Sequence, residues 1–136
     1  MDSLDRFIEA QEKSYSTALE EIKRGRKTSH WMWYVFPQID GLGYSETAKY
    51  YAIKDLDEAK RYLDNKILNN RLREISDVLL TLNESNPINI FGFIDSTKLK
   101  SCMTLFDIIS PNDIFQKVLD KYYNGEKDEL TLQLVK

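Results

Sequence analysis

The chain has 136 residues, of which 42% are hydrophobic and 30% are charged. At this length a chain buries roughly two-thirds of the surface that it exposes when unfolded, so one domain over residues 1–136 is expected without a metal or disulfide staple. The formal net charge of -3 argues against a nucleic-acid partner, because such proteins need a basic face to neutralise phosphates. The composition indicates neither disorder nor a membrane protein.

Targeting and cofactor signals are both missing from the sequence. No apolar stretch approaches the ~20 residues that a bilayer-spanning helix needs, and residues 1–5 lack the basic and apolar regions of a secretory signal. A cytoplasmic protein with no membrane partner is therefore expected. Cys102 is the only cysteine and His30 the only histidine, so an internal disulfide is excluded and a Cys/His zinc site is not expected. Neither a metal nor a cofactor is predicted.

The spacing of apolar residues predicts helices along the whole chain. Steps of three and four residues indicate a first helix over residues 4–22, which Ser3 can cap and Gly25 can end. Residues 88–94 are predicted to form a helical turn and a loop. No segment alternates apolar and polar residues, so a compact all-α, multihelical fold is expected. Capping residues and periodicity predict the remaining helices over residues 45–52, 55–65, 67–82, 96–109, 113–123 and 128–134, with Ser45, Asp55, Ser96, Asp113 and Asp128 at their starts.

Residues 31–36 are nearly all apolar, so their periodicity does not distinguish a buried helix from a strand. A short buried helix is favoured, because Ser29 is a plausible N-cap and Pro37 would stop the element. The turn that follows contains Gly41 and Gly43, which let the chain reverse close to this aromatic cluster.

The segment from residue 27 to residue 38 is the first candidate binding site, because it holds the only histidine and both tryptophans. A cationic side chain, a hydroxyl and the first amides of the predicted helix would suit a phosphate or carboxylate. The aromatic rings offer faces for stacking a base, and a glutamine offers both a donor and an acceptor. The sequence therefore predicts an anionic, nucleotide-like small molecule as the partner, bound by Lys27, Ser29, His30, Trp31, Trp33 and Gln38.

The same residues also have a structural interpretation. Trp31, Met32, Val35 and Phe36 would serve equally as core, because aromatic side chains supply most of the buried area in small domains. His30 would then be a structural imidazole bonded to the backbone. The sequence leaves both interpretations open.

A second candidate site is the polar edge of the helix predicted from residue 96. Lys100 and Thr104 lie four residues apart and would share one side of that helix with Ser101, while its apolar residues face the core. An ordinary amphipathic helix gives the same pattern. We expect this edge and residues 27–38 to meet across one cleft.

Standard catalytic motifs are absent: the sequence has no phosphate-binding loop, no dinucleotide fingerprint, no zinc-protease motif and no nucleophile elbow. Cys102 lies on the apolar face of a predicted helix, which favours a buried, inert thiol over a nucleophile. Ser29 and His30 are adjacent, and adjacent residues rarely present a nucleophile to its base. Covalent catalysis is not predicted.

The string GRKTSHWMWYVFPQ at residues 25–38, the GLG at 41–43 and KLKSCMTLF at 98–106 resemble the signature of a bacterial family. The chain is similar over nearly all of its length to the domain-of-unknown-function family eighteen-ten, whose members are sometimes labelled calpastatin. The resemblance implies a small all-helical fold in a cytoplasmic, prokaryotic or phage setting, and it brings no established reaction. Family members often have serine where this chain has Cys102.

The function predicted first is a small-molecule binding protein for a phosphate-bearing, nucleotide-like ligand such as an ADP-ribose-like or cyclic nucleotide. The first alternative is a hydrolase of such a ligand, with His30 as acid or base and Asp95 or Asp128 assisting. The second alternative is a protein-interaction or inhibitor module that uses exposed aromatic side chains as an anchor.

Overall fold

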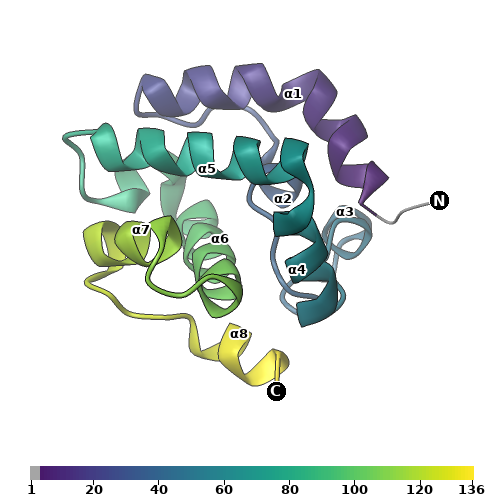
Figure 1. The fold of residues 1–136 in the computed structure, drawn as a ribbon. Helices are drawn as coiled ribbons and strands as arrows, with labels where there is room; N and C mark the ends of the chain where they lie inside the picture. The colour runs from purple at the N-terminus through teal and green to yellow at the C-terminus, as the bar shows by residue number, and fades with distance from the viewer. Residues whose placement is uncertain (1–3) are drawn as a thin grey trace.

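The computed structural model describes residues 4–136, which form eight α-helices and no strand (Figure 1). The prediction of an all-α fold is confirmed. No helix within these residues is long and apolar enough to cross a membrane. The helices are α1 (Asp5–Lys23), α2 (Met32–Val35), α3 (Glu46–Tyr50), α4 (Leu56–Asp64), α5 (Lys66–Thr81), α6 (Pro87–Ile109), α7 (Ile114–Tyr123) and α8 (Glu129–Leu134).

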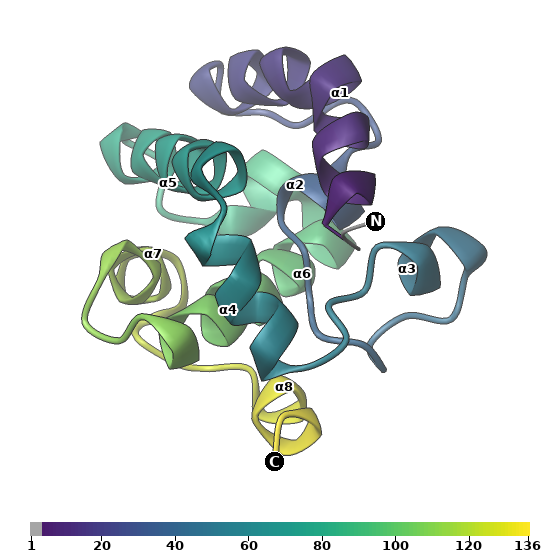
Figure 2. The ribbon, with the colours of Figure 1, turned by 45° about the vertical axis from the view of Figure 1, so that its right-hand side comes forward.

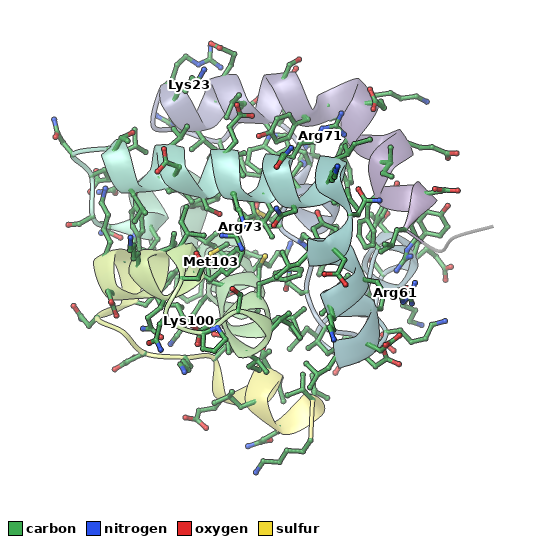
Figure 3. All side chains as sticks on the ribbon, viewed as in Figure 1. Lys23, Arg61, Arg71, Arg73, Lys100 and Met103 are labelled. Carbon is green, nitrogen blue, oxygen red and sulfur yellow. The ribbon has the colours of Figure 1, made fainter. Side chains whose placement is uncertain are left out.

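Helix α6 occupies the centre of the arrangement, and the other helices are placed around it. The long helices α1 and α5 lie side by side, α7 packs against both α5 and α6, and α8 lies against α6 (Figure 1). Side chains of α6 from Leu99 to Phe106 are buried almost continuously, and Met103 points into the interior (Figure 3). Burial on several sides explains why this helix is more apolar than an amphipathic surface helix.

Most helix starts depend on local capping, and these predictions are confirmed. The side chains of Ser45, Asp55, Asp113 and Asp128 each accept a hydrogen bond from a backbone amide in the first turn of the helix that follows. Gly25 follows α1 with a φ of 78°, a left-handed conformation that glycine adopts without strain. The predicted cap Ser3 lies outside the described residues.

The start predicted at Ser96 is wrong, because α6 begins nine residues earlier, at Pro87. Asn86 caps it, with its Oδ1 accepting a 3.0 Å hydrogen bond from the amide of Ile88. The helical turn predicted over residues 88–94 is therefore the first part of α6, which a kink at Gly92 (φ 80°, ψ 169°) separates from the rest. Ser96 lies beyond the kink, and its hydroxyl donates to the carbonyl of Phe93 instead of capping.

Helix α3 stands at the edge of the molecule on an excursion of the chain between residues 39 and 53 (Figure 2). The two ends of this excursion are joined by a parallel bridge between Ile39 and Ile53, which is completed by hydrogen bonds of 2.8 Å on each side. Ala48 is the buried residue of the helix. The excursion therefore has a fixed base and a largely exposed tip.

Candidate functional site

The loop between α1 and α2 is organised by one buried carboxylate, that of Glu21. Its Oε1 accepts hydrogen bonds from the amides of Thr28 (2.7 Å) and Ser29 (2.9 Å) and from the indole Nε1 of Trp31 (3.0 Å). Its Oε2 accepts a 2.5 Å bond from the Ser29 hydroxyl. Neutral donors from Thr28, Ser29 and Trp31 thus converge on a single internal anion.

This arrangement shows that the prediction of Ser29 as the N-cap of the short helix is wrong. The short helix α2 is present, but Trp31 occupies its N-cap position and no side chain caps it. Ser29 does not cap the helix because its hydroxyl and amide are bound to Glu21. The Ser29 amide and hydroxyl, which were expected to bind an anionic ligand, therefore already bind the carboxylate of Glu21.

The Glu21 carboxylate is held in its charged form. Burial raises its pKa, but the hydrogen bonds from the Ser29 hydroxyl, the loop amides and the Trp31 indole outweigh burial and lower the pKa to about 2. At neutral pH the residue is an acceptor only, which suits the donors around it.

Lys27 extends from this loop to α6. Its amide donates a 2.8 Å hydrogen bond to the carbonyl of Ile90. Its Nζ lies 2.8 Å from Asp95 Oδ2, 2.5 Å from the Ser29 carbonyl oxygen, and 5.0 Å from the centre of the Trp31 ring. Only 8% of the Lys27 side chain is exposed, so the ammonium group is fixed and largely desolvated.

Lys98 reaches the same carboxylate from the other side. Its Nζ lies 3.0 Å from Asp95 Oδ1 and 4.3 Å from the centre of the Trp33 ring, a cation–π distance. Burial raises the pKa of Asp95, but hydrogen bonds and charge from Lys27 and Lys98 outweigh this and lower it. Asp95 is thus an ionised bridge between two ammonium groups, each of which also contacts a tryptophan ring.

These groups line a pocket of about 130 Å³ between α2 and α6, which we call the two-lysine pocket. Among the residues predicted to bind a ligand, the structure brings Lys27, His30, Trp31 and Trp33 to it; His30 is exposed at its rim. Its full lining is Lys27, His30, Trp31, Met32, Trp33, Tyr34, Thr47, Asp95 and Lys98.

Sequence reasoning missed Lys98 and Thr47 as members of this pocket. The spacing of Lys98 three residues after Asp95 places the two on one side of a helix, which was the available signal. Thr47 comes from α3 and had no such signal, because its position depends on how the excursion folds back.

Trp33 connects the pocket to the glycine turn. A Cβ atom added to Gly43 would lie 2.7 Å from Cη2 of Trp33 and 2.6 Å from Cβ of Ala48, closer than real contacts allow. A Cβ at Gly41 would lie 3.1 Å from the side chain of Leu134 in α8. The expected close approach of the turn to the aromatic cluster is confirmed, and it fixes the far edge of the Trp33 ring.

Much of the aromatic segment is core, as its structural interpretation predicted. Trp31, Met32, Val35 and Phe36 are all buried. Gln38, predicted to bind a ligand, is also buried. Its backbone carbonyl accepts a hydrogen bond from the amide of Ile53, and its side-chain Nε2 has no hydrogen-bond partner within residues 4–136. Gln38 does not line the two-lysine pocket.

The second predicted site has a different arrangement from the one expected. Ser101 Oγ donates to Asp128 Oδ2 (3.1 Å), and Thr104 Oγ1 accepts from the Asp128 amide (2.9 Å), so both residues anchor the start of α8. Lys100 lies beside the segment leading to α8, with its Nζ 3.6 Å from Glu126 (Figure 3). The residues that α6 contributes to the two-lysine pocket are instead Asp95 and Lys98.

Cys102 is fully buried, and burial raises the pKa of its thiol well above the ordinary value. A buried thiol with a raised pKa is a poor nucleophile, because the thiolate is the reactive form. The prediction of a buried thiol at this position is confirmed.

The fold and the pocket together define a small all-helical protein in which a lysine pair and two tryptophans frame one carboxylate. The chain belongs to the family described as "Protein of unknown function (DUF1810)", whose model matches residues 1–135. It is similar to the conserved hypothetical protein Rv1873 from Mycobacterium tuberculosis, whose crystal structure was determined at 1.38 Å. That similarity has a TM-score of 0.94 and 42% identity, and it covers 97% of this chain and 95% of that chain. No curated protein matches the chain.

Proposed function

We propose that the protein binds a small phosphate-bearing, nucleotide-like ligand, with the phosphate at the two-lysine pocket. The observation that supports this most is the convergence of Lys27 and Lys98, from segments far apart in the sequence, on one half-buried carboxylate. Two ammonium groups and one carboxylate leave a charge of +1 at a partly desolvated position, where an added anion is favoured.

The size of the pocket decides which part of the ligand enters it. Sites for drug-sized molecules usually measure about 300–1,000 Å³, whereas this pocket measures about 130 Å³. It fits a phosphate group and not a whole nucleotide. The rest of the ligand would lie across the exposed rim, where His30 and Thr47 offer hydrogen bonds and Trp33 offers part of a ring face.

Asp95 acts in this proposal as an internal competitor for the phosphate. The carboxylate occupies the position between Lys27 and Lys98 that a phosphate oxygen would take. The pyrophosphate of an ADP-ribose-like ligand carries two negative charges and four unesterified oxygens, which is more charge and more acceptors than the carboxylate offers, so it can hold both ammonium groups at once. The lysines remain correctly placed in the free protein because Asp95 holds them.

A thermal-shift titration with ADP-ribose and cyclic AMP tests the proposal. A ligand present at 100-fold its dissociation constant stabilises the folded protein by about 2.7 kcal/mol. We expect this shift in the native protein and its loss in Lys98→Gln. The control variant Lys60→Gln removes an exposed lysine of α4 outside the pocket and should keep the shift. A flat response of the native protein to both nucleotides would contradict the proposal.

A hydrolase acting on the same kind of ligand is the second candidate, because His30 and Asp95 line one pocket. Asp128, the other carboxylate considered for this role, is bound to Ser101 and Thr131 as the cap of α8 and lies on a different part of the fold. Mass spectrometry of ADP-ribose incubated with the native protein and with His30→Ala tests turnover. Product formed by the native protein alone would support it, and unchanged ADP-ribose in both samples would reject it.

A further inference from the structure

We propose a second, separate binding site in the cleft beside α3, for a phosphate monoester that carries an aromatic ring. The cleft measures about 580 Å³, within the usual range for small-molecule sites. It shares no lining residue with the two-lysine pocket. We call it the α3 cleft, and its lining includes Arg6, Tyr44, Lys49, Tyr50, Lys54 and Glu58.

The floor of the α3 cleft is rigid. The guanidinium of Arg6 donates to the carbonyls of Tyr50 (2.7 Å) and Ala52 (2.8 Å) and to the carboxylate of Glu58 (3.0 Å). The Glu58 side chain is 1% exposed and also accepts from the amide of Lys54. This network ties α1 to both ends of the α3–α4 connection, so the cleft exists before any ligand arrives and little ordering entropy opposes binding.

Two cations of the cleft are available to a ligand. Lys49 and Lys54 are exposed, and neither forms an ion pair with any residue from 4 to 136. By contrast, the lysines of the two-lysine pocket are both paired with Asp95. The Arg6–Glu58 pair is neutral and Asp40 also lines the cleft, so the two unpaired ammonium groups leave it with a net charge of +1. A phosphate monoester, whose charge is close to -2 at neutral pH, is attracted to such a site and can contact both lysines at once.

The aromatic part of the ligand follows from the tyrosines of the cleft. Tyr44 is 85% exposed and Tyr50 is 59% exposed, which is unusual for large aromatic side chains in a soluble domain. Tyr50 packs edge-on against Tyr51 with the ring centres 4.8 Å apart, so its orientation is fixed while a face stays open. A ring stacked on these tyrosines would cover apolar surface that is now in water.

The test uses phenyl phosphate, inorganic phosphate and benzyl alcohol as probes, each titrated into the full-length ¹⁵N-labelled protein. We expect phenyl phosphate to shift the amide resonances of Tyr44, Lys49, Tyr50 and Lys54 with one common, saturable dissociation constant. Inorganic phosphate should bind the same residues at least tenfold more weakly, because it lacks the ring. Benzyl alcohol should give no saturable shift at matched concentration, because it lacks the charge.

Lysine variants show whether phenyl phosphate binds at the α3 cleft or at lysines elsewhere on the protein. Lys49→Gln with Lys54→Gln should weaken phenyl phosphate at least tenfold, and Lys60→Gln should leave it unchanged. Lys27→Gln with Lys98→Gln removes the charges of the two-lysine pocket and any phosphate binding there, but it should leave the dissociation constant measured at the Tyr44, Lys49, Tyr50 and Lys54 amides unchanged. Failure here and failure of the proposed function are therefore distinguishable. Equal affinity for phenyl phosphate and inorganic phosphate, or no effect of the Lys49/Lys54 double variant, would overturn the proposal.

Discussion

The indole Nε1 of Trp31 donates a 3.0 Å hydrogen bond to Oε1 of Glu21, which also holds the amides of Thr28 and Ser29. This bond joins the end of α1 to the first residue of the aromatic segment. Lys27 directly precedes Thr28 in the sequence. Because the Glu21 carboxylate holds the backbone of Thr28 and Ser29 in place, it also fixes the direction in which the Lys27 side chain approaches Asp95. The position of the two-lysine pocket therefore depends on a residue that does not line it.

Glu21→Gln should destabilise the protein by about 2–3 kcal/mol at pH 7, because hydrogen bonds to a charged acceptor are replaced by weaker neutral ones. Urea unfolding of the variant measures this loss. Glu20→Gln is the matched control, since Glu20 is the adjacent residue and is exposed; it should change stability by less than about 0.5 kcal/mol. Equal effects of the two substitutions would show that the Glu21 network does not stabilise the loop.

The pH dependence of stability should reveal the same carboxylate. Its pKa is about 2 in the folded protein against an ordinary value of 4.5, so the folded state favours the charged form. The stabilisation is complete above pH 4.5 and is lost as the pH falls toward 2, and it amounts to about 3 kcal/mol. Other carboxylates of low pKa, such as Asp113, act in the same direction. The difference between the native protein and Glu21→Gln isolates Glu21: it should shrink steadily between pH 5 and pH 2, and a constant difference would refute the assignment.

Asp95→Asn should tighten binding of inorganic phosphate to the two-lysine pocket by on the order of tenfold, because it removes the carboxylate that occupies Lys27 and Lys98. Calorimetric titration measures the change. Asp57→Asn removes the same charge from an exposed position on α4, paired there with Arg61, and should have little effect. Weaker binding in Asp95→Asn would mean that Asp95 contributes to the ligand site instead of competing for it.

Gly43→Ala should destabilise the protein by about 1–3 kcal/mol, because the added methyl group would overlap Trp33 and Ala48. Trp33→Phe removes the ring atoms that the methyl group meets. The double variant should therefore lose less stability than the sum of the two single variants, as a double-mutant cycle of chemical unfolding would show. Additive losses would indicate that the cost at Gly43 comes from Ala48 alone.

Local signals in the sequence predicted most of the fold. Asp55 and Asp113 were recognised as caps because the amides that they bind lie one to three residues away. Ser29 is also of a residue type that caps helices, but the carboxylate that its amide and hydroxyl bind belongs to Glu21, eight residues back in α1. The helix start predicted at Ser96 is wrong for a related reason. Helix α6 continues beyond the kink at Gly92, whereas sequence propensity alone indicates that a helix ends at such a glycine.

The candidate site was located in part by the sequence. The concentration of rare side chains indicates residues 27–38, and four of the predicted residues in that segment line the pocket. Which lysine of α6 faces them depends on the rotation of a helix buried on several sides, where apolar periodicity gives little direction. Lys98 meets Trp33, whereas Lys100, two residues on, turns toward Tyr123.

The two tryptophans allow the most direct test of the proposed function. Trp31 is 1% exposed with its indole bound to Glu21, whereas Trp33 is half-buried at the pocket. In a ¹⁵N–¹H spectrum each gives one indole resonance that can be followed during a titration with ADP-ribose. We predict a saturable shift of the Trp33 resonance, a much smaller shift of Trp31, and loss of the Trp33 response in Lys98→Gln. Two indole resonances that stay unchanged at millimolar ADP-ribose, or a Trp33 shift that persists in Lys98→Gln, would contradict phosphate binding at the two-lysine pocket.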